Sequence, residues 1–221
     1  MALPILHIGN KNYSSWSMRP WLALKWGGIA FEERVIPLGG EGYGRSQISA
    51  IRAISPSGRV PALQTGGVVV YESLAICEWA AEQAPSLWPA DPLVRAQARS
   101  AAAEMHAGFA ALRRDMSMNI RRRLPRAPEW PADTRGDIEQ LNAIWGDLLA
   151  RFGGPFLFGE RSIADAMFAP VTTRLRTYAV EISPQARGYC ATMFADEAFQ
   201  DWERAAEVET WSIEQSEALY R

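Results

Sequence analysis

The sequence predicts an α/β fold followed by an all-α one. Strand-like segments occur only before residue 85, where they alternate with helical ones. Segment 85–92, PSLWPADP, contains three prolines in eight residues, which is typical of a boundary. Beyond it, apolar residues recur only at helical spacing. We therefore expect a sheet-containing domain over 1–84, a linker over 85–92 and a helical domain over 93–221.

The first elements form a strand–helix–strand unit. Residues 3–8 are a nearly continuous apolar run, as in a strand buried on both faces. A helix then begins near Ser17 and ends at Gly27-Gly28. A second strand over 31–38 follows, so a parallel pair is expected. Residues 45–54 favour a short helix.

A hairpin over 61–71 follows. Gly66-Gly67 can supply the positive φ values of its turn, and Ser73 is placed to cap a helix over 74–84. Because proline is tolerated at an open edge, Val60-Pro61 favours an edge strand whose backbone pairs with an extended peptide. The nearby helix N-terminus can hold a carboxylate. Together these features predict a site for a small anionic peptide.

The helical half has clear beginnings and ends. One long helix is expected over 93–123, followed by a proline-containing loop over 124–134. Apolar residues from Ile138 to Phe152 fall on one helical face. Ser162 and Asp165 form a near capping box. Further helices are expected after Ser183-Pro184 and over 196–207.

Composition excludes several classes of function. A net charge of −2 gives no electrostatic case for nucleic acid or an anionic membrane. The two cysteines, Cys77 and Cys190, have no disulfide-framework or metal-ligand spacing, so no metal is expected. No signal peptide or membrane-spanning run is evident. We expect a cytoplasmic protein.

The hairpin segment resembles a known family. Val60-Pro61 followed by Glu72-Ser73 is similar to the glutathione-binding half of the glutathione S-transferases, and the 156–165 segment resembles the capping motif of their helical domain. The resemblance implies a thioredoxin-like N-terminal domain, a helical C-terminal domain and a homodimer. It also implies that Val60, beside Pro61, pairs through its backbone with glutathione, and that Glu72 and Ser73 hold the γ-glutamyl end.

Thiol chemistry directs attention to the first strand–helix junction. Glutathione reacts as a thiolate, and lowering its thiol pKa by roughly two units requires about 2.7 kcal/mol. A hydroxyl at a helix N-terminus can supply most of this. Ser14, Ser15 and Ser17 are the candidates there.

Segment 14–19, SSWSMR, is similar to the SSCSxR signature of the zeta class, the maleylacetoacetate isomerases. That resemblance implies Ser14 as the thiol activator, with Ser15 as the alternative. Trp16 stands where the zeta class has a cysteine, so thiol-transfer chemistry at this position is not expected, and the case for isomerase activity is weaker. We place Trp16 and Gln47 among the glutathione-binding residues.

Two histidines have different predicted roles. His106 lies in EMHAGF, which resembles a beta-class segment whose histidine faces the glutathione site. The alternative is a solvent-facing or domain-interface histidine. His7 is expected to be a hydrogen-bonded core residue. Cys77 is expected to be buried and inert.

The remaining candidates concern a second substrate. Arg113-Arg114 and Arg121–Arg123 are expected at a solvated helix end, with the alternative that one holds an anionic substrate. Met116, Met118 and Trp130 would line an apolar pocket or pack in the core. The resulting hypothesis is a glutathione transferase that attacks a small electrophile. Alternatives are a maleylacetoacetate-type cis–trans isomerase and a non-catalytic glutathione-binding module.

Overall fold

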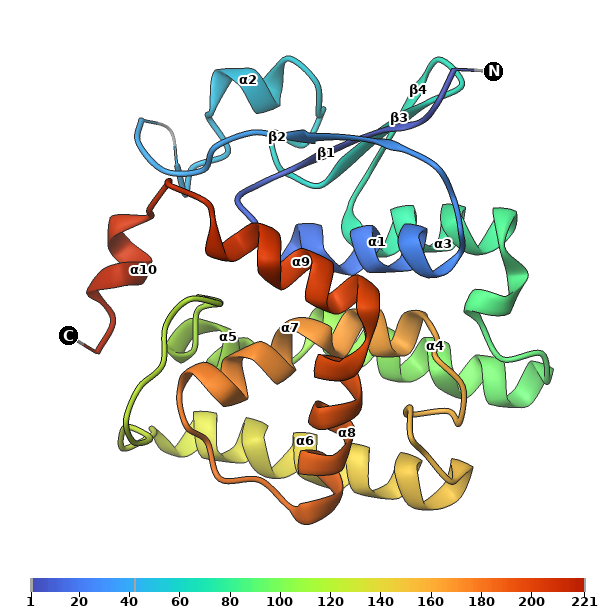
Figure 1. Cartoon of the computed structure of the whole chain (residues 1–221), viewed down its shortest axis with the longest axis vertical. Coiled ribbons are helices and arrows are strands. Elements are labelled where there is room, and N and C mark those ends of the chain that lie inside the picture. Colours follow the sequence, from blue (N-terminus) through green and yellow to red (C-terminus); the bar gives the residue numbers. More distant parts are fainter. Residues whose placement is uncertain (1, 42, 221) are drawn as a thin grey trace.

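The computed structural model describes residues 2–41 and 43–220. Its N-terminal part contains the strands β1 (Ile5–Ile8), β2 (Glu32–Val35), β3 (Ala62–Thr65) and β4 (Val68–Tyr71). They form one sheet in the order β2-β1-β3-β4, in which only the β1–β2 pair is parallel. Helices α1 (Ser15–Trp26) and α3 (Ser73–Gln83) cover one face of the sheet, and the short α2 (Ser49–Arg52) lies beyond the other (Figure 1). The predicted strand–helix–strand unit and hairpin are confirmed.

The predicted edge position of the hairpin's first strand is wrong. β3 pairs with both β1 and β4, so it is an interior strand. Its paired residues begin at Ala62, and Pro61 therefore lies just outside the ladder, where its missing N–H costs nothing. The Val60-Pro61 bond is cis. Val60 thus remains beyond the end of the sheet with its backbone outside the strand register.

The cap of α3 also differs from the prediction. The helix begins at Ser73, and its N-cap is Glu72, whose side-chain carboxylate accepts the backbone N–H groups of Ser73 at 2.6 Å and Leu74 at 2.9 Å. A serine hydroxyl reaches one such donor, whereas a carboxylate reaches two with a favourable charge. Glu72 has a φ of 85°, which directs its side chain back over its own helix.

The second part is all-helical, as predicted. After a 3₁₀ turn, η1 (Pro85–Leu87), it contains α4 (Pro92–Ala107), α5 (Ala110–Asp115), α6 (Ala132–Phe152), α7 (Ile163–Thr177), α8 (Pro184–Ala195), α9 (Glu197–Glu207) and α10 (Glu214–Ala218). Figure 1 shows α7 surrounded by the other helices and α1 stacked above them. Within the described residues, no helix combines the length and apolarity needed to cross a bilayer.

The single long helix expected over 93–123 is two helices. α4 ends at Gly108, and Phe109 adopts a left-handed φ of 54° before α5 begins. A Cβ at residue 108 would lie 2.9 Å from the Glu104 carbonyl oxygen, so this break requires a glycine. Arg113 donates to the carbonyl oxygens of Met105 and Gly108, which caps the end of α4. Residues 116–123 are not helical.

The core of the helical part is α7. Fourteen of its fifteen residues are buried, including Phe168 beside the fully buried Trp145. The predicted capping box is present: the Asp165 carboxylate accepts the N–H and the hydroxyl of Ser162, and also the N–H of Leu157. This carboxylate therefore fixes both the start of α7 and the preceding loop.

Candidate active site

A cavity of about 630 Å³ lies beside the sheet at the N-terminal ends of α1 and α3. Its walls come from the β1–α1 loop, the 38–48 loop, the 57–61 segment, the β4–α3 turn and residues of α1, α2 and α4. Of the nine predicted site residues, seven line it: Ser14, Trp16, Val60, Pro61, Glu72, Ser73 and His106. The hairpin and the first helix therefore meet at one site.

Ser14 stands at the start of α1. It is the N-cap residue, it is 6% exposed, and it lines the cavity. Its hydroxyl donates to Ser17 Oγ over 2.8 Å, and Ser17 Oγ also accepts the N–H of Gly9 at 3.1 Å. The N–H groups at this helix end give a positive potential around the Ser14 hydroxyl.

Ser15 has a different environment. It is buried, it is absent from the cavity wall, and its Oγ accepts a hydrogen bond from Arg174 Nη2 at 3.0 Å. Adjacent residues in a helix point about 100° apart. The two serines that the sequence could not separate therefore face different neighbours: Ser14 faces the cavity and Ser15 faces α7.

Trp16 forms the wall between the cavity and a group of arginines. The centre of the Arg19 guanidinium lies 4.3 Å from its ring centroid, and that of Arg113 lies at 5.7 Å. The His106 ring packs edge-on at 5.4 Å. The indole is half-buried, so it covers the arginines on one side and faces the cavity on the other.

Arg19 and Arg174 are almost completely buried. Burial, together with weaker repulsion from neighbouring arginines that include Arg113, lowers the pKa of Arg19 to about 9 and that of Arg174 to about 10. Nη1 and Nη2 of Arg19 and Nη1 of Arg174 have no hydrogen-bond partner among the described residues. The site thus concentrates positive charge behind Trp16 and Ser15.

The sequence reasoning missed both buried arginines. Arg19 belongs to the quoted SSWSMR segment, but it was given no role. Arg174 lies inside a helix predicted only for its capping and packing. The signal that could have identified them is an arginine at a position where helical spacing puts the side chain in the core, since arginine is rarely buried without a partner.

The β4–α3 turn presents its charged groups to the cavity. Glu72 Oε1 accepts the Ser73 hydroxyl at 2.9 Å in addition to the backbone N–H groups of α3. His106 Nε2 lies 3.7 Å from the same oxygen. The structure therefore places His106 at the cavity and not in solvent.

Three further expectations have clear outcomes. Gln47 is exposed and does not line the cavity, although its neighbours Ser46 and Ile48 do. His7 is buried and its Nε2 lies 2.9 Å from Gln64 Oε1, as expected for a core histidine. Burial raises the pKa of the Cys77 thiol well above its usual range and that of Cys190 to about 12, so neither thiol is reactive.

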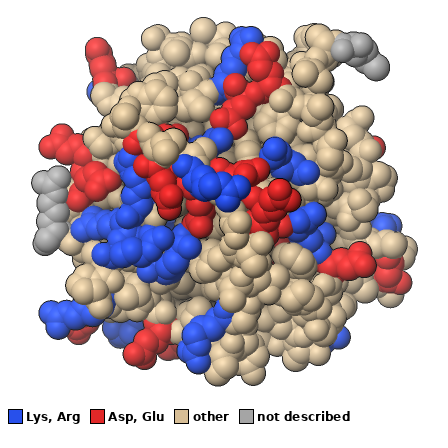
Figure 2. Space-filling model, in the orientation of Figure 1, with Lys and Arg blue, Asp and Glu red and all other residues tan. Residues whose placement is uncertain are grey.

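The arginine run after α5 binds the C-terminal segment and does not end a helix, because residues 116–123 are not helical, although Arg121 and Arg123 are exposed as predicted. Arg121 donates to the carbonyl oxygens of Glu209 and Trp211, and Arg122 donates to those of Glu217 and Tyr220. Figure 2 shows basic side chains gathered on this face with acidic ones between them. The guanidinium groups of Arg121 and Arg122 therefore hold the C-terminal segment in place.

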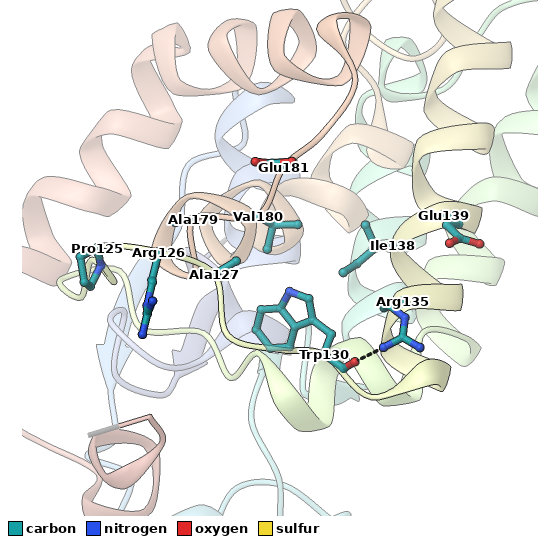
Figure 3. Close-up of a pocket in the computed structure, with 10 residues that line it drawn as sticks. All are labelled: Pro125, Arg126, Ala127, Trp130, Arg135, Ile138, Glu139, Ala179, Val180 and Glu181. Atoms are coloured by element: carbon teal, nitrogen blue, oxygen red, sulfur yellow. Dashed lines mark hydrogen bonds between the residues drawn. The ribbon is translucent and has the colours of Figure 1, made fainter.

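Of the three apolar candidates in the helical part, two belong to packing and one also lines a cavity. Met116 and Met118 are buried in the core. Trp130 packs against Tyr178 and Tyr220 and lines a second cavity, of about 650 Å³, on the helical part (Figure 3). That cavity is separate from the one at Ser14, since no residue lines both.

Comparison with known proteins gives consistent matches. Residues 13–83 match the family described as glutathione S-transferase, N-terminal domain. A maleylpyruvate isomerase from Ralstonia sp is 31% identical over 195 residues, which cover 79% of this chain and 86% of the relative. The maleylacetoacetate isomerase of Rattus norvegicus is 28% identical over 184 residues, which cover 82% of each chain.

Solved structures agree with these relatives. A glutathione transferase homologue from Burkholderia with bound glutathione superposes with a TM-score of 0.72 at 25% identity, covering 93% of this chain and 99% of that one. A maleylpyruvate isomerase, described as a bacterial zeta-class glutathione S-transferase, gives 0.70 at 25% identity and covers 94% and 100%. The thioredoxin-like domain and the helical domain implied by the sequence are thereby confirmed, and the chain belongs to the glutathione S-transferase family of enzymes.

Proposed function

We propose that this protein binds glutathione in the cavity at Ser14, stabilises its thiolate with the Ser14 hydroxyl, and adds that thiolate to a small electrophile that carries a carboxylate. The observation that carries the proposal is the position of the Ser14 hydroxyl at the N-terminus of α1 and on the cavity wall. A hydrogen bond to a charged acceptor contributes about 1.5–3 kcal/mol, which matches a thiol pKa lowered by one to two units.

The opposite end of the cavity suits the γ-glutamyl group. This group carries a carboxylate and an ammonium, and the β4–α3 turn offers a partner for each. The N–H groups of Ser73 and Leu74 currently bind the Glu72 carboxylate. We propose that the ligand's carboxylate takes over these donors and that Glu72 then pairs with its ammonium. Val60, on the cavity wall, supplies its backbone to the cysteinyl unit.

The arginines behind the thiol position support an anionic electrophile. Arg113 lies 5.7 Å from the Trp16 ring centroid and Arg174 donates to Ser15 Oγ, and neither forms an ion pair with a carboxylate within the described residues. A carboxylate on the second substrate would offset their mutual repulsion. The relatives named for isomerisation of maleylacetoacetate and maleylpyruvate act on such carboxylates, which favours cis–trans isomerisation as the second candidate activity.

Both activities begin with the same addition of thiolate to carbon. In conjugation the adduct takes up a proton or expels a leaving group, and glutathione stays attached to the product. In isomerisation a bond of the adduct rotates and glutathione is expelled unchanged. A homodimer in the cytoplasm is the assembly and location that we propose for either activity.

The test is a pH titration of the ultraviolet thiolate absorbance of bound glutathione in the wild type, Ser14→Ala and Ser15→Ala. We expect Ser14→Ala to raise the bound thiol pKa toward its free value of about 8.5 and Ser15→Ala to leave it lowered. If both variants keep the lowered pKa, serine activation is wrong. Maleylacetone isomerisation and aryl-halide conjugation are measured beside it; binding without either reaction would indicate the non-catalytic module.

A further inference from the structure

Ser17 lies directly behind Ser14, away from the cavity. It is fully buried in the first turn of α1, between the end of β1 and the Ser14 side chain. Its Oγ accepts two hydrogen bonds, from Gly9 N–H at 3.1 Å and from the Ser14 hydroxyl at 2.8 Å. Its own proton has no acceptor within residues 2–41 and 43–220.

This arrangement has a direct consequence for thiol activation. A hydroxyl has one proton to donate and two lone pairs. While Ser14 donates its proton to Ser17, it has none to donate to a sulfur atom. The opposite direction, in which Ser17 donates to Ser14 and the Ser14 proton is released for another acceptor, requires both hydroxyls to reorient while their oxygens stay within hydrogen-bond distance.

We propose that Ser17 is a positioning residue that reverses this hydrogen bond when a thiolate occupies the cavity, an inference that rests on the proposed function. The resulting chain runs from Gly9 N–H to Ser17, from Ser17 to Ser14, and from Ser14 to the sulfur. Each bond polarises the next, which makes Ser14 a stronger donor than an isolated serine. No O–H bond breaks: two hydroxyls rotate, and the thiol proton leaves to solvent.

The backbone holds this chain together. A Cβ at Gly9 would lie 3.2 Å from the Ser14 Cβ and 2.5 Å from Leu38 Cδ1, so the end of β1 packs directly against the serine. This close approach fits the hydrogen bond from the Gly9 N–H to Ser17 Oγ. Ser15 cannot take the same part, because its hydroxyl faces Arg174.

The test is the thiol pKa of bound glutathione in Ser17→Ala and in Ser17→Thr, which keeps the hydroxyl. We expect Ser17→Ala to raise the pKa by about half a unit to one unit, which is a threefold to tenfold smaller thiolate fraction below the pKa. Ser17→Thr should restore most of the shift. The affinity for glutathione measured at about pH 5, where the bound thiol is protonated, should change less than about twofold, since Ser17 does not touch the cavity. Thr172→Val, which removes a buried hydroxyl bonded to its own helix, should leave the thiol pKa unchanged.

The outcomes separate this inference from the proposed function. If Ser14→Ala raises the thiol pKa and Ser17→Ala does not, the reversal is wrong and serine activation stands. If neither Ser14→Ala nor Ser15→Ala raises it, the proposed function itself fails. The double variant Ser14→Ala/Ser17→Ala should match Ser14→Ala alone, and an additive rise would contradict the chain. Should Ser17→Ala not fold, Ser17→Cys replaces it, because a thiol is a weaker donor and an intermediate pKa is then required.

Discussion

The Trp16 indole covers the guanidinium of Arg19, whose central carbon lies 4.3 Å from the ring centroid. Arg19 has no exposed surface, its Nε binds the carbonyl oxygen of Met167, and both of its Nη atoms lack partners among the described residues. A buried cation without a carboxylate is costly, and a π face is among the few neutral groups that attract it. The tryptophan that stands in place of the zeta-signature cysteine therefore stabilises the buried Arg19 cation.

Replacing Trp16 with Leu should lower the free energy of unfolding by about 2 kcal/mol, because a desolvated cation–π contact contributes about that amount. Trp16→Phe should lose less, since it keeps an aromatic face. Urea denaturation followed by circular dichroism measures both. Trp211→Leu is the matched control, because that side chain is exposed on the C-terminal segment and should change stability by less than about 0.5 kcal/mol. Equal losses in the Leu and Phe variants would contradict a role for the ring.

The sequence was sufficient for features that depend on local chemistry. The Gly66-Gly67 turn, the Ser162–Asp165 capping box and the boundary near residue 85 follow from residue types at fixed spacing, and the structure contains the turn and the capping box. The positions of Ser14, Val60 and His106 were predicted from the motif resemblance, and they line one cavity.

Other features depend on contacts between distant segments. The break at Gly108-Phe109 is stabilised by Arg113 folding back on α4, which no helical periodicity reveals. The different environments of Ser14 and Ser15 follow from Arg174, more than 150 residues away. The role of Arg121 depends on a C-terminal segment that the sequence analysis did not place.

Asp165 predicts a pH dependence of stability. Burial raises its pKa to about 6, although the hydrogen bonds that the carboxylate accepts oppose the shift. The unfolded carboxyl titrates near 3.9, so between pH 4 and 6 the folded state binds the proton and the unfolded state does not. Stability therefore falls as pH rises through this window, by about 3 kcal/mol at most.

Asp165→Asn should remove this dependence. The unfolding free energy of the wild type minus that of Asp165→Asn, measured at several pH values from 4 to 7, should decrease as pH rises to about 6. Above about pH 6 it should stay constant. Glu139→Gln, a change at an exposed helix position, serves as the control. A difference that does not vary with pH would show that Asp165 titrates normally.

The C-terminal segment should stabilise the loop that carries Ser14. The Glu209 carboxylate accepts the backbone N–H groups of Lys11 at 2.6 Å and Asn12 at 3.0 Å. Glu209→Ala leaves both donors without that partner, which costs about 1–3 kcal/mol. Hydrogen exchange at these two amides should accelerate, whereas Glu214→Ala, an exposed change in α10, should leave it unaltered. Unchanged exchange in Glu209→Ala would mean that the segment does not hold the loop.

Glu72 should control binding of the γ-glutamyl end. Glu72→Ala removes the proposed partner of the ligand ammonium, so retention on immobilised glutathione should be lost. Glu72→Gln keeps an oxygen for the α3 cap but not the charge, so it should weaken binding about tenfold while folding is preserved. Glu82→Gln, exposed on the same helix, is the control. Retention of Glu72→Ala on the resin would place the γ-glutamyl group elsewhere.

Arg113 should distinguish charged from neutral electrophiles. The centre of its guanidinium lies 5.7 Å from the Trp16 ring centroid and outside the cavity wall, so it would attract a substrate carboxylate electrostatically across the indole. Arg113→Met should reduce kcat/KM for a carboxylate-bearing electrophile by about tenfold to a hundredfold, which corresponds to 1.5–3 kcal/mol. It should reduce kcat/KM for a neutral aryl halide by much less.

Because Arg113 also caps α4, the ratio of the two kcat/KM values is the decisive quantity, and any loss of folded protein cancels from it. Arg114→Met removes a neighbouring arginine that pairs with Asp115 and Asp133 in solvent and should leave the ratio unchanged. An equal loss for both electrophiles in Arg113→Met would remove the case for an anionic second substrate.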